Sequence, residues 1–106
     1  MSETFLFIEN QIKNNDVVLF MKGTKQSPMC GFSAVVASIL TKLGVDFIDV
    51  NVLASNELRE GIKEYSDWPT IPQVYVKQEF IGGCDIIREM NESGELQELL
   101  KSKNII

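Results

Sequence analysis

The two cysteines are the residues of this sequence with the clearest capacity for chemistry. Cys30 lies in the stretch SPMCGFS (27–33), directly before a segment with the apolar periodicity of a helix. A thiol at a helix N-terminus meets the positive end of the helix dipole and unpaired backbone N–H groups, and both favour the thiolate. Lys22, at the end of the preceding apolar run, is placed to add positive charge. We therefore interpret Cys30 as a reactive thiolate rather than an inert buried thiol.

Ser33 stands where a disulfide oxidoreductase usually carries its second cysteine, with two residues between it and the first. The stretch therefore holds one thiolate and no neighbouring thiol that could resolve a mixed disulfide. Three uses of Cys30 stay open on these grounds. They are exchange with an external thiol, ligation of a metal, and resolution by the distant Cys84 through a disulfide between the two cysteines.

Two further segments carry groups suited to recognition. A cis Pro72 would leave the amide of Ile71 free to pair with an extended peptide, although base rates favour an ordinary trans proline by about ten to one. In the turn GGCD (82–85), exposed N–H groups and Asp85 would hold the carboxylate and ammonium of an amino-acid-like group. The alternative is that Asp85 only caps the next helix. The charges of 55–65, Lys63 included, fit a solvated helix face.

The hydrophobic pattern predicts an α/β fold with the order α-β-α-β-α-β-β-α-α. A strand, helix and strand over 17–52 form a βαβ unit with parallel strands, and a hairpin follows. This order is that of a thioredoxin-like domain, with a central four-stranded mixed sheet flanked by helices. Strands are predicted at 17–21, 45–52, 73–76 and 79–81, and helices at 4–14, 30–43 and 55–65, from near 85, and around 96–100.

Length and charge exclude several classes of function. The 106 residues fit one domain, 1–106, with a single core. A net charge of -5 with no His and no basic stretch argues against nucleic acid or an anionic membrane as the main partner. Neither a signal peptide nor a bilayer-spanning run is present, and two cysteines suit a reducing compartment. We expect a cytoplasmic protein, although a trimmed organellar form would look the same.

Four separated motifs of the chain belong together. They are Lys22-Gly23-Thr24, CGFS at 30–33, WPTIPQ at 68–73 and GGCD at 82–85. In this order and spacing they resemble the monothiol glutaredoxins of the CGFS type, over essentially the whole chain. One departure is Lys25, where that family often has proline, and we expect this change to loosen the loop before Cys30.

The resemblance implies a thioredoxin-like fold, glutathione binding and a [2Fe-2S] cluster that bridges two subunits. Such a cluster usually needs four thiolates, and two Cys30 side chains with two glutathione thiols complete that count. Cys30 would thus be the cluster ligand, and the same groove would hold glutathione. The implied glutathione contacts are Lys22 and Arg59 for the glycine carboxylate, the backbone of Ile71, the main chain of Cys84 with Asp85 for the γ-glutamyl end, and Phe32 and Thr70 as groove lining.

Two functions from different classes follow. In the first, the protein is a carrier that holds the cluster in a homodimer and passes it to recipient iron-sulfur apoproteins. In the second, it is a glutathione-dependent thiol-disulfide oxidoreductase, in which Cys30 takes glutathione from a mixed disulfide and free glutathione resolves it. A third possibility is regulation, in which the same cluster site docks a BolA-type partner and reports iron status.

Overall fold

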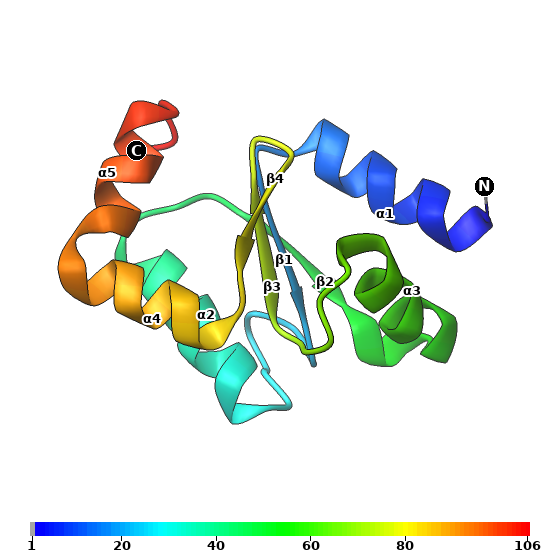
Figure 1. Ribbon diagram of the computed structural model, residues 1–106. Helices are drawn as coiled ribbons and strands as arrows, with labels where there is room; N and C mark the ends of the chain where they lie inside the picture. The colour runs from blue at the N-terminus through cyan, green and yellow to red at the C-terminus, as the bar shows by residue number, and fades with distance from the viewer. Residues whose placement is uncertain (1) are drawn as a thin grey trace.

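Strand β1 (Val17–Met21) is formed by the β-branched apolar run that the sequence predicts as a strand covered on both faces, and all five residues are buried. The computed structural model describes residues 2–106 and places β1 inside a sheet of order β2-β1-β3-β4 (Figure 1). β1 pairs in parallel with β2 (Ile48–Asn51) and antiparallel with β3 (Gln73–Val76), which forms a hairpin with β4 (Glu79–Gly82). The predicted four-stranded mixed sheet is confirmed.

Within residues 2–106, five α-helices and one short 3-10 helix accompany the sheet. Serine hydroxyls fix the start of two of them, because Ser2 Oγ accepts from the Phe5 N–H at 3.1 Å and Ser55 Oγ accepts from the Leu58 N–H at 3.0 Å. The helices are α1 (Glu3–Asn14), α2 (Gly31–Lys42), η1 (Val52–Ala54), α3 (Asn56–Ser66), α4 (Cys84–Ser93) and α5 (Glu95–Ser102).

Alternate residues of β1 face two separate apolar clusters. Leu19 and its neighbours at odd positions pack with α2, α4 and α5, whereas Val18 and Phe20 pack with α1 and α3. Figure 1 shows these two groups of helices on opposite sides of the sheet. The helices and the sheet therefore form three layers, and the predicted thioredoxin-like arrangement is confirmed.

The strand directions bring three connections to one end of the sheet. Because β3 is antiparallel to β1, the residue after β1, Lys22, lies at the same end as Ile71 and Pro72, which precede β3. The end of β4 arrives there as well and leads through Gly83 into α4. The peptide bond between Ile71 and Pro72 is cis. Three of the four sequence motifs thus meet through topology alone. The fourth, CGFS at 30–33, follows the loop that starts at Lys22 and returns to it through the bond from the Met29 N–H to the Lys22 carbonyl.

The second strand is shorter than the sequence predicts. β2 begins at Ile48, while Val45 and Phe47 are buried in the core without being part of the strand. It ends at Asn51, whose side-chain oxygen accepts from the Gly23 N–H and the Leu53 N–H, both at 2.9 Å. This side-chain turn starts η1, which the hydrophobic pattern did not predict. In the part of the chain that the structure describes, no helix has the length and apolar character needed to cross a bilayer.

Candidate functional site

A groove with a volume of about 510 Å³ lies at this end of the sheet. Pockets that bind small molecules typically have roughly 300–1,000 Å³. The wall combines the end of β1, the start of α2, the segment before β3 and the start of α4. The residues predicted from the sequence to form a glutathione site lie in this wall, with the exception of Arg59. Those in the wall are Lys22, Cys30, Phe32, Thr70, Ile71, Cys84 and Asp85.

Cys30 is the N-cap residue of α2 and is partly buried. The pKa of its thiol lies below the ordinary value, chiefly because the backbone N–H of Ser33 favours the thiolate. Burial opposes this change, and the Phe32 N–H, the Ser33 hydroxyl and the Lys22 ammonium support it. The helix N-terminus therefore acts on Sγ through its first N–H groups, and its dipole acts in the same direction. The site therefore favours a thiolate at Cys30.

Ser33 is fully buried, and its Oγ accepts a hydrogen bond of 3.1 Å from the Lys22 N–H. This bond ties the first turn of α2 to the end of β1, on either side of the loop that contains Cys30. The same hydroxyl contributes to the lowered pKa of Cys30. Ser33 thus has a structural role, whereas the sequence pattern identified it only as the absence of a second thiol.

The loop from Lys22 to Met29 is fastened at its base and near its tip. At the base, the Met29 N–H donates to the Lys22 carbonyl at 2.9 Å. Near the tip, the Lys25 N–H donates to Asp49 Oδ2 and Lys25 Nζ donates to the Phe47 carbonyl, each at 2.8 Å. Nζ also lies 4.6 Å from the centroid of the Phe47 ring. The expectation that Lys25 loosens this loop is wrong, because lysine supplies two donors that proline lacks.

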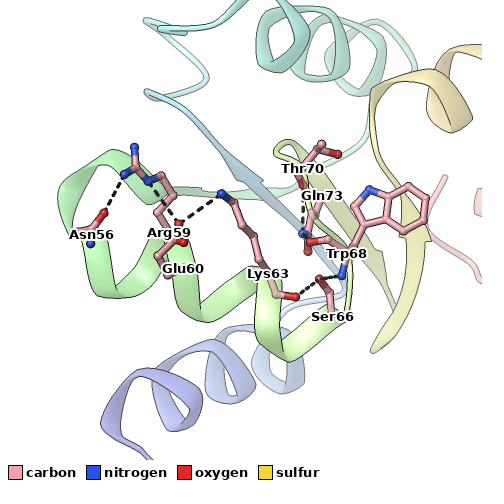
Figure 2. A network of polar contacts seen from close by, with 8 residues as sticks. All are labelled: Asn56, Arg59, Glu60, Lys63, Ser66, Trp68, Thr70 and Gln73. Atoms are coloured by element: carbon pink, nitrogen blue, oxygen red, sulfur yellow. Dashed lines mark hydrogen bonds and ion pairs between the residues drawn. The ribbon is translucent and has the colours of Figure 1, made fainter.

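The segment before β3 is held by Gln73, which is fully buried. Gln73 Nε2 donates to the carbonyls of Trp68 and Thr70, each at 3.1 Å (Figure 2). Trp68 forms part of the groove wall and packs on Phe80, with ring centroids 5.5 Å apart. Within residues 2–106 the Ile71 N–H has no hydrogen-bonding partner. The sequence motif contained Gln73 without indicating that it shapes this segment.

Gly83 allows the two sides of the groove to approach closely. A Cβ atom at this position would lie 3.1 Å from the Pro72 carbonyl oxygen and 3.3 Å from Trp68 Nε1. Gly83 is also the N-cap of α4 and provides no side-chain cap. The first N–H groups of α4 therefore face the groove end without a side-chain acceptor, beside the carboxylate of Asp85.

Cys84 differs from Cys30 in its electrostatic surroundings. Burial raises the pKa of the Cys84 thiol; Arg88 opposes this, while Asp85 and Cys30 add to it. Both cysteines are free thiols. The groove thus combines one thiol whose pKa is lowered, that of Cys30, with one whose pKa is raised, that of Cys84.

Arg59 does not lie in the groove wall, and Lys63 does. Arg59 Nη2 donates to Asn56 Oδ1 at 2.7 Å, and its Nε lies 3.8 Å from Glu60 Oε2 (Figure 2). The sequence pattern placed Lys63 on a solvated helix face and indicated no role for it in the groove. A signal was available, because Lys63 follows Arg59 by four residues and shares its face of α3.

Comparison with known proteins identifies the family. The glutaredoxin family model matches residues 17–81, which is more than half of the chain. The chain is 61% identical over 101 residues to the probable monothiol glutaredoxin 2 of Rickettsia conorii, covering 95% of this chain and 94% of that one. The chain belongs to the monothiol glutaredoxins. The resemblance to the monothiol glutaredoxins, predicted from the sequence motifs, is therefore confirmed.

Solved glutaredoxin structures agree with this assignment. The chain superimposes on the solution structure of a monomeric truncated mutant of Trypanosoma brucei 1-C-Grx1 with a TM-score of 0.89 and 42% identity, covering 100% of this chain and 96% of the other. The solution structure of reduced poplar apo GrxS14 gives a TM-score of 0.83 and 49% identity, with 93% and 91% covered. Both similarities span nearly the full length of this glutaredoxin.

The donor set of this glutaredoxin limits what it can hold by itself. Among residues 2–106, no group of three or more Cys, His, Asp or Glu side chains is arranged to hold a metal ion. Cys30 is the groove thiol with the lowered pKa, and Cys84 lies in the same wall. Any metal cargo at Cys30 therefore needs further ligands from outside the chain.

Proposed function

We propose that this monothiol glutaredoxin binds glutathione in the groove and, together with it, holds a [2Fe-2S] cluster between two copies of the chain. The cluster is cargo, which passes to recipient iron-sulfur apoproteins. The observation that carries the proposal is the position of Cys30, a thiolate-favouring residue in the wall of a groove of about 510 Å³. A thiol-bearing tripeptide in that groove would bring its own sulfur next to Cys30.

The cationic part of the groove suits the glycine carboxylate of glutathione. Lys22 and Lys63 both lie in the wall and supply two ammonium groups. In this proposal Lys63 takes the place that the sequence assigned to Arg59, which lies outside the wall. The unpartnered N–H of Ile71 would pair with the extended backbone of the tripeptide, in the manner of an added strand.

The start of α4 suits the γ-glutamyl end. Its free carboxylate would accept from the first N–H groups of the helix, including the main chain at Cys84, where the helix dipole also favours an anion. The carboxylate of Asp85 would pair with the α-ammonium group. Both charges of one amino-acid end are thereby matched within one helical turn.

The number of available thiolates supports a shared cluster. A [2Fe-2S] cluster is usually held by about four thiolates. Each chain supplies one cysteine whose pKa is lowered, Cys30, since burial raises the pKa of Cys84. Two chains and two glutathione molecules complete the number, which makes the cluster-bound form a homodimer. Because two of its ligands are dissociable small molecules, the cluster would leave readily for a recipient apoprotein or serve a BolA-type regulatory partner. A reducing compartment such as the cytoplasm would keep the thiols available.

The test is reconstitution of the cluster with glutathione present, followed by visible absorption and by iron, sulfide and glutathione analysis. We expect about one cluster per two chains. Cys30→Ser should abolish the visible absorption. Cys84→Ser is the matched control and should retain it, since Cys84 is proposed to act through its main chain. A cluster that survives Cys30→Ser at the wild-type yield would contradict the assignment.

Catalysis of thiol-disulfide exchange is a second candidate, favoured by the lowered pKa of Cys30. Cys30 would attack a glutathionylated substrate, form a mixed disulfide with glutathione and release the substrate thiol. A second glutathione would then attack that mixed disulfide, giving oxidised glutathione and restoring the Cys30 thiolate. Turnover of a glutathionylated peptide at rates typical of a two-cysteine glutaredoxin would favour this function over the carrier.

A further inference from the structure

Glu60 lies between the two cationic side chains of α3. Its Oε2 atom is 3.3 Å from Lys63 Nζ and 3.8 Å from Arg59 Nε. Figure 2 shows the three side chains joined in one polar network, which continues from Arg59 to Asn56. A carboxylate of the protein itself thus pairs with Lys63, the cation that α3 contributes to the groove wall, and with Arg59 outside the wall.

These ion pairs are weak enough to be exchanged. The side chains of Lys63, Arg59 and Glu60 are 33%, 41% and 56% exposed, respectively. Exposed pairs of this kind contribute little to stability, because water and salt screen the charges. A ligand carboxylate entering the groove would compete with Glu60 for the Lys63 ammonium and would also be repelled by the Glu60 charge.

We propose that Glu60 is an internal competitor for the ligand carboxylate, which weakens the binding of a peptide whose C-terminal carboxylate meets Lys63. This inference rests on the proposed glutathione binding and identifies a specificity-determining residue of the same site. Without a ligand, the Glu60 carboxylate pairs with Lys63 and Arg59 and so competes with anions from solution for these two cations. With the ligand bound, the ligand carboxylate replaces Glu60 at Lys63.

The location of Glu60 separates this role from a structural one. It lies inside α3 (Asn56–Ser66), away from the caps, and its side chain is exposed rather than packed in either apolar cluster. Lys22, the other cation of the groove, forms no ion pair with a carboxylate of residues 2–106. Removal of the Glu60 charge should therefore free Lys63 to pair with a ligand carboxylate and leave the surroundings of Lys22 unchanged.

The experiment is a titration of the reduced protein with glutathione, followed by the fluorescence of Trp68. Trp68 is the only tryptophan of the sequence and lies in the groove wall. Glu60→Gln should bind glutathione about two- to fivefold more tightly than the wild type, in line with the strength of exposed ion pairs. Damage to the fold would weaken binding, so a gain of affinity cannot arise from it.

Two controls decide between outcomes. Glu64→Gln removes the same charge from an exposed position of α3 that has no ion pair within residues 2–106, and it should change the affinity less than Glu60→Gln does. Glutathione whose glycine carboxylate is amidated should bind the wild type and Glu60→Gln equally.

The outcomes separate this inference from the proposed function. If the wild type binds glutathione and Glu60→Gln binds it no more tightly, the inference about Glu60 is overturned and the proposed function stands. If neither protein binds glutathione, the proposed function fails and the inference fails with it.

Discussion

The two thiols of the groove should react at different rates. The thiolate is the nucleophile, and a lower pKa gives a larger thiolate fraction at neutral pH. Because the pKa of Cys30 is lowered by the α2 N-terminus and that of Cys84 is raised by burial, alkylation at pH 7 should modify Cys30 first. The ratio of thiolate fractions is roughly tenfold for each unit that separates the two pKa values.

Iodoacetamide labelling between pH 6 and 10, with peptide mass spectrometry, measures both rates. The difference should narrow as the pH rises above both pKa values, and it should vanish in the denatured chain. Faster labelling of Cys84 at pH 7 would mean that the groove does not favour the Cys30 thiolate.

The type of chemistry at single residues could be predicted from the sequence. The identity of the cation that α3 contributes to the groove wall could not. Cys30 and Asp85 were found because a glycine-containing turn before a helix has a recognisable pattern. Arg59 and Lys63 share one face of α3, so periodicity alone cannot distinguish them. In the structure Lys63 lies in the groove wall, whereas Arg59 lies outside it and donates to Asn56 Oδ1.

The loop from Lys22 to Met29 depends on Lys25 for its attachment to the β2 side of the sheet. Lys25→Ala removes the bond to the Phe47 carbonyl and the contact with the ring, while the backbone bond to Asp49 can persist. We expect a loss of about 1–2 kcal/mol in the free energy of unfolding. Lys25→Arg should recover part of this loss, because guanidinium can also donate and stack.

Urea unfolding and amide hydrogen exchange measure this effect. Exchange at the Ser27 and Met29 amides, which donate within the loop, should accelerate in Lys25→Ala more than exchange in β1. Lys42→Ala is the matched control, since that exposed lysine forms no ion pair within residues 2–106. Unchanged protection of the two loop amides would show that Lys25 does not hold the loop.

At the scale of elements, prediction worked where one periodic pattern decided the outcome. The run of β1 and the serine caps of α1 and α3 determine those elements locally. The predicted end of β2 differs from the structure and η1 is unpredicted, because a contact distant in sequence determines them. Asn51 ends β2 through a side-chain turn and also receives the Gly23 N–H, so η1 depends on a loop 28 residues away. Tertiary contacts of this kind have no periodic signal.

Across the whole molecule, the side-chain charges of the groove are less negative than those of the chain. The net charge of the chain is -5, whereas the groove wall holds two lysines, Lys22 and Lys63, and one carboxylate, that of Asp85. Glutathione, with two carboxylates and one ammonium, is a net anion at neutral pH. The molecule as a whole therefore repels this ligand, while the groove attracts it at short range. The balance between the repulsion by the whole chain and the attraction by the groove lysines decides how added salt changes the affinity for glutathione.

High salt, rather than moderate salt, should weaken glutathione binding, because the direct contacts with the two lysines act at the distance of an ion pair. The Debye length falls from about 30 Å at 0.01 M to about 3 Å at 1 M ionic strength, so salt first removes the long-range repulsion and then competes for the short-range pairs. We expect a dissociation constant that is flat or slightly lower up to about 0.1 M NaCl and several-fold higher at about 1 M. Lys22→Gln should flatten the second part of this curve, whereas Lys42→Gln, outside the groove, should not. An affinity that rises steadily to 1 M salt would show that the net charge, rather than the groove lysines, governs recognition.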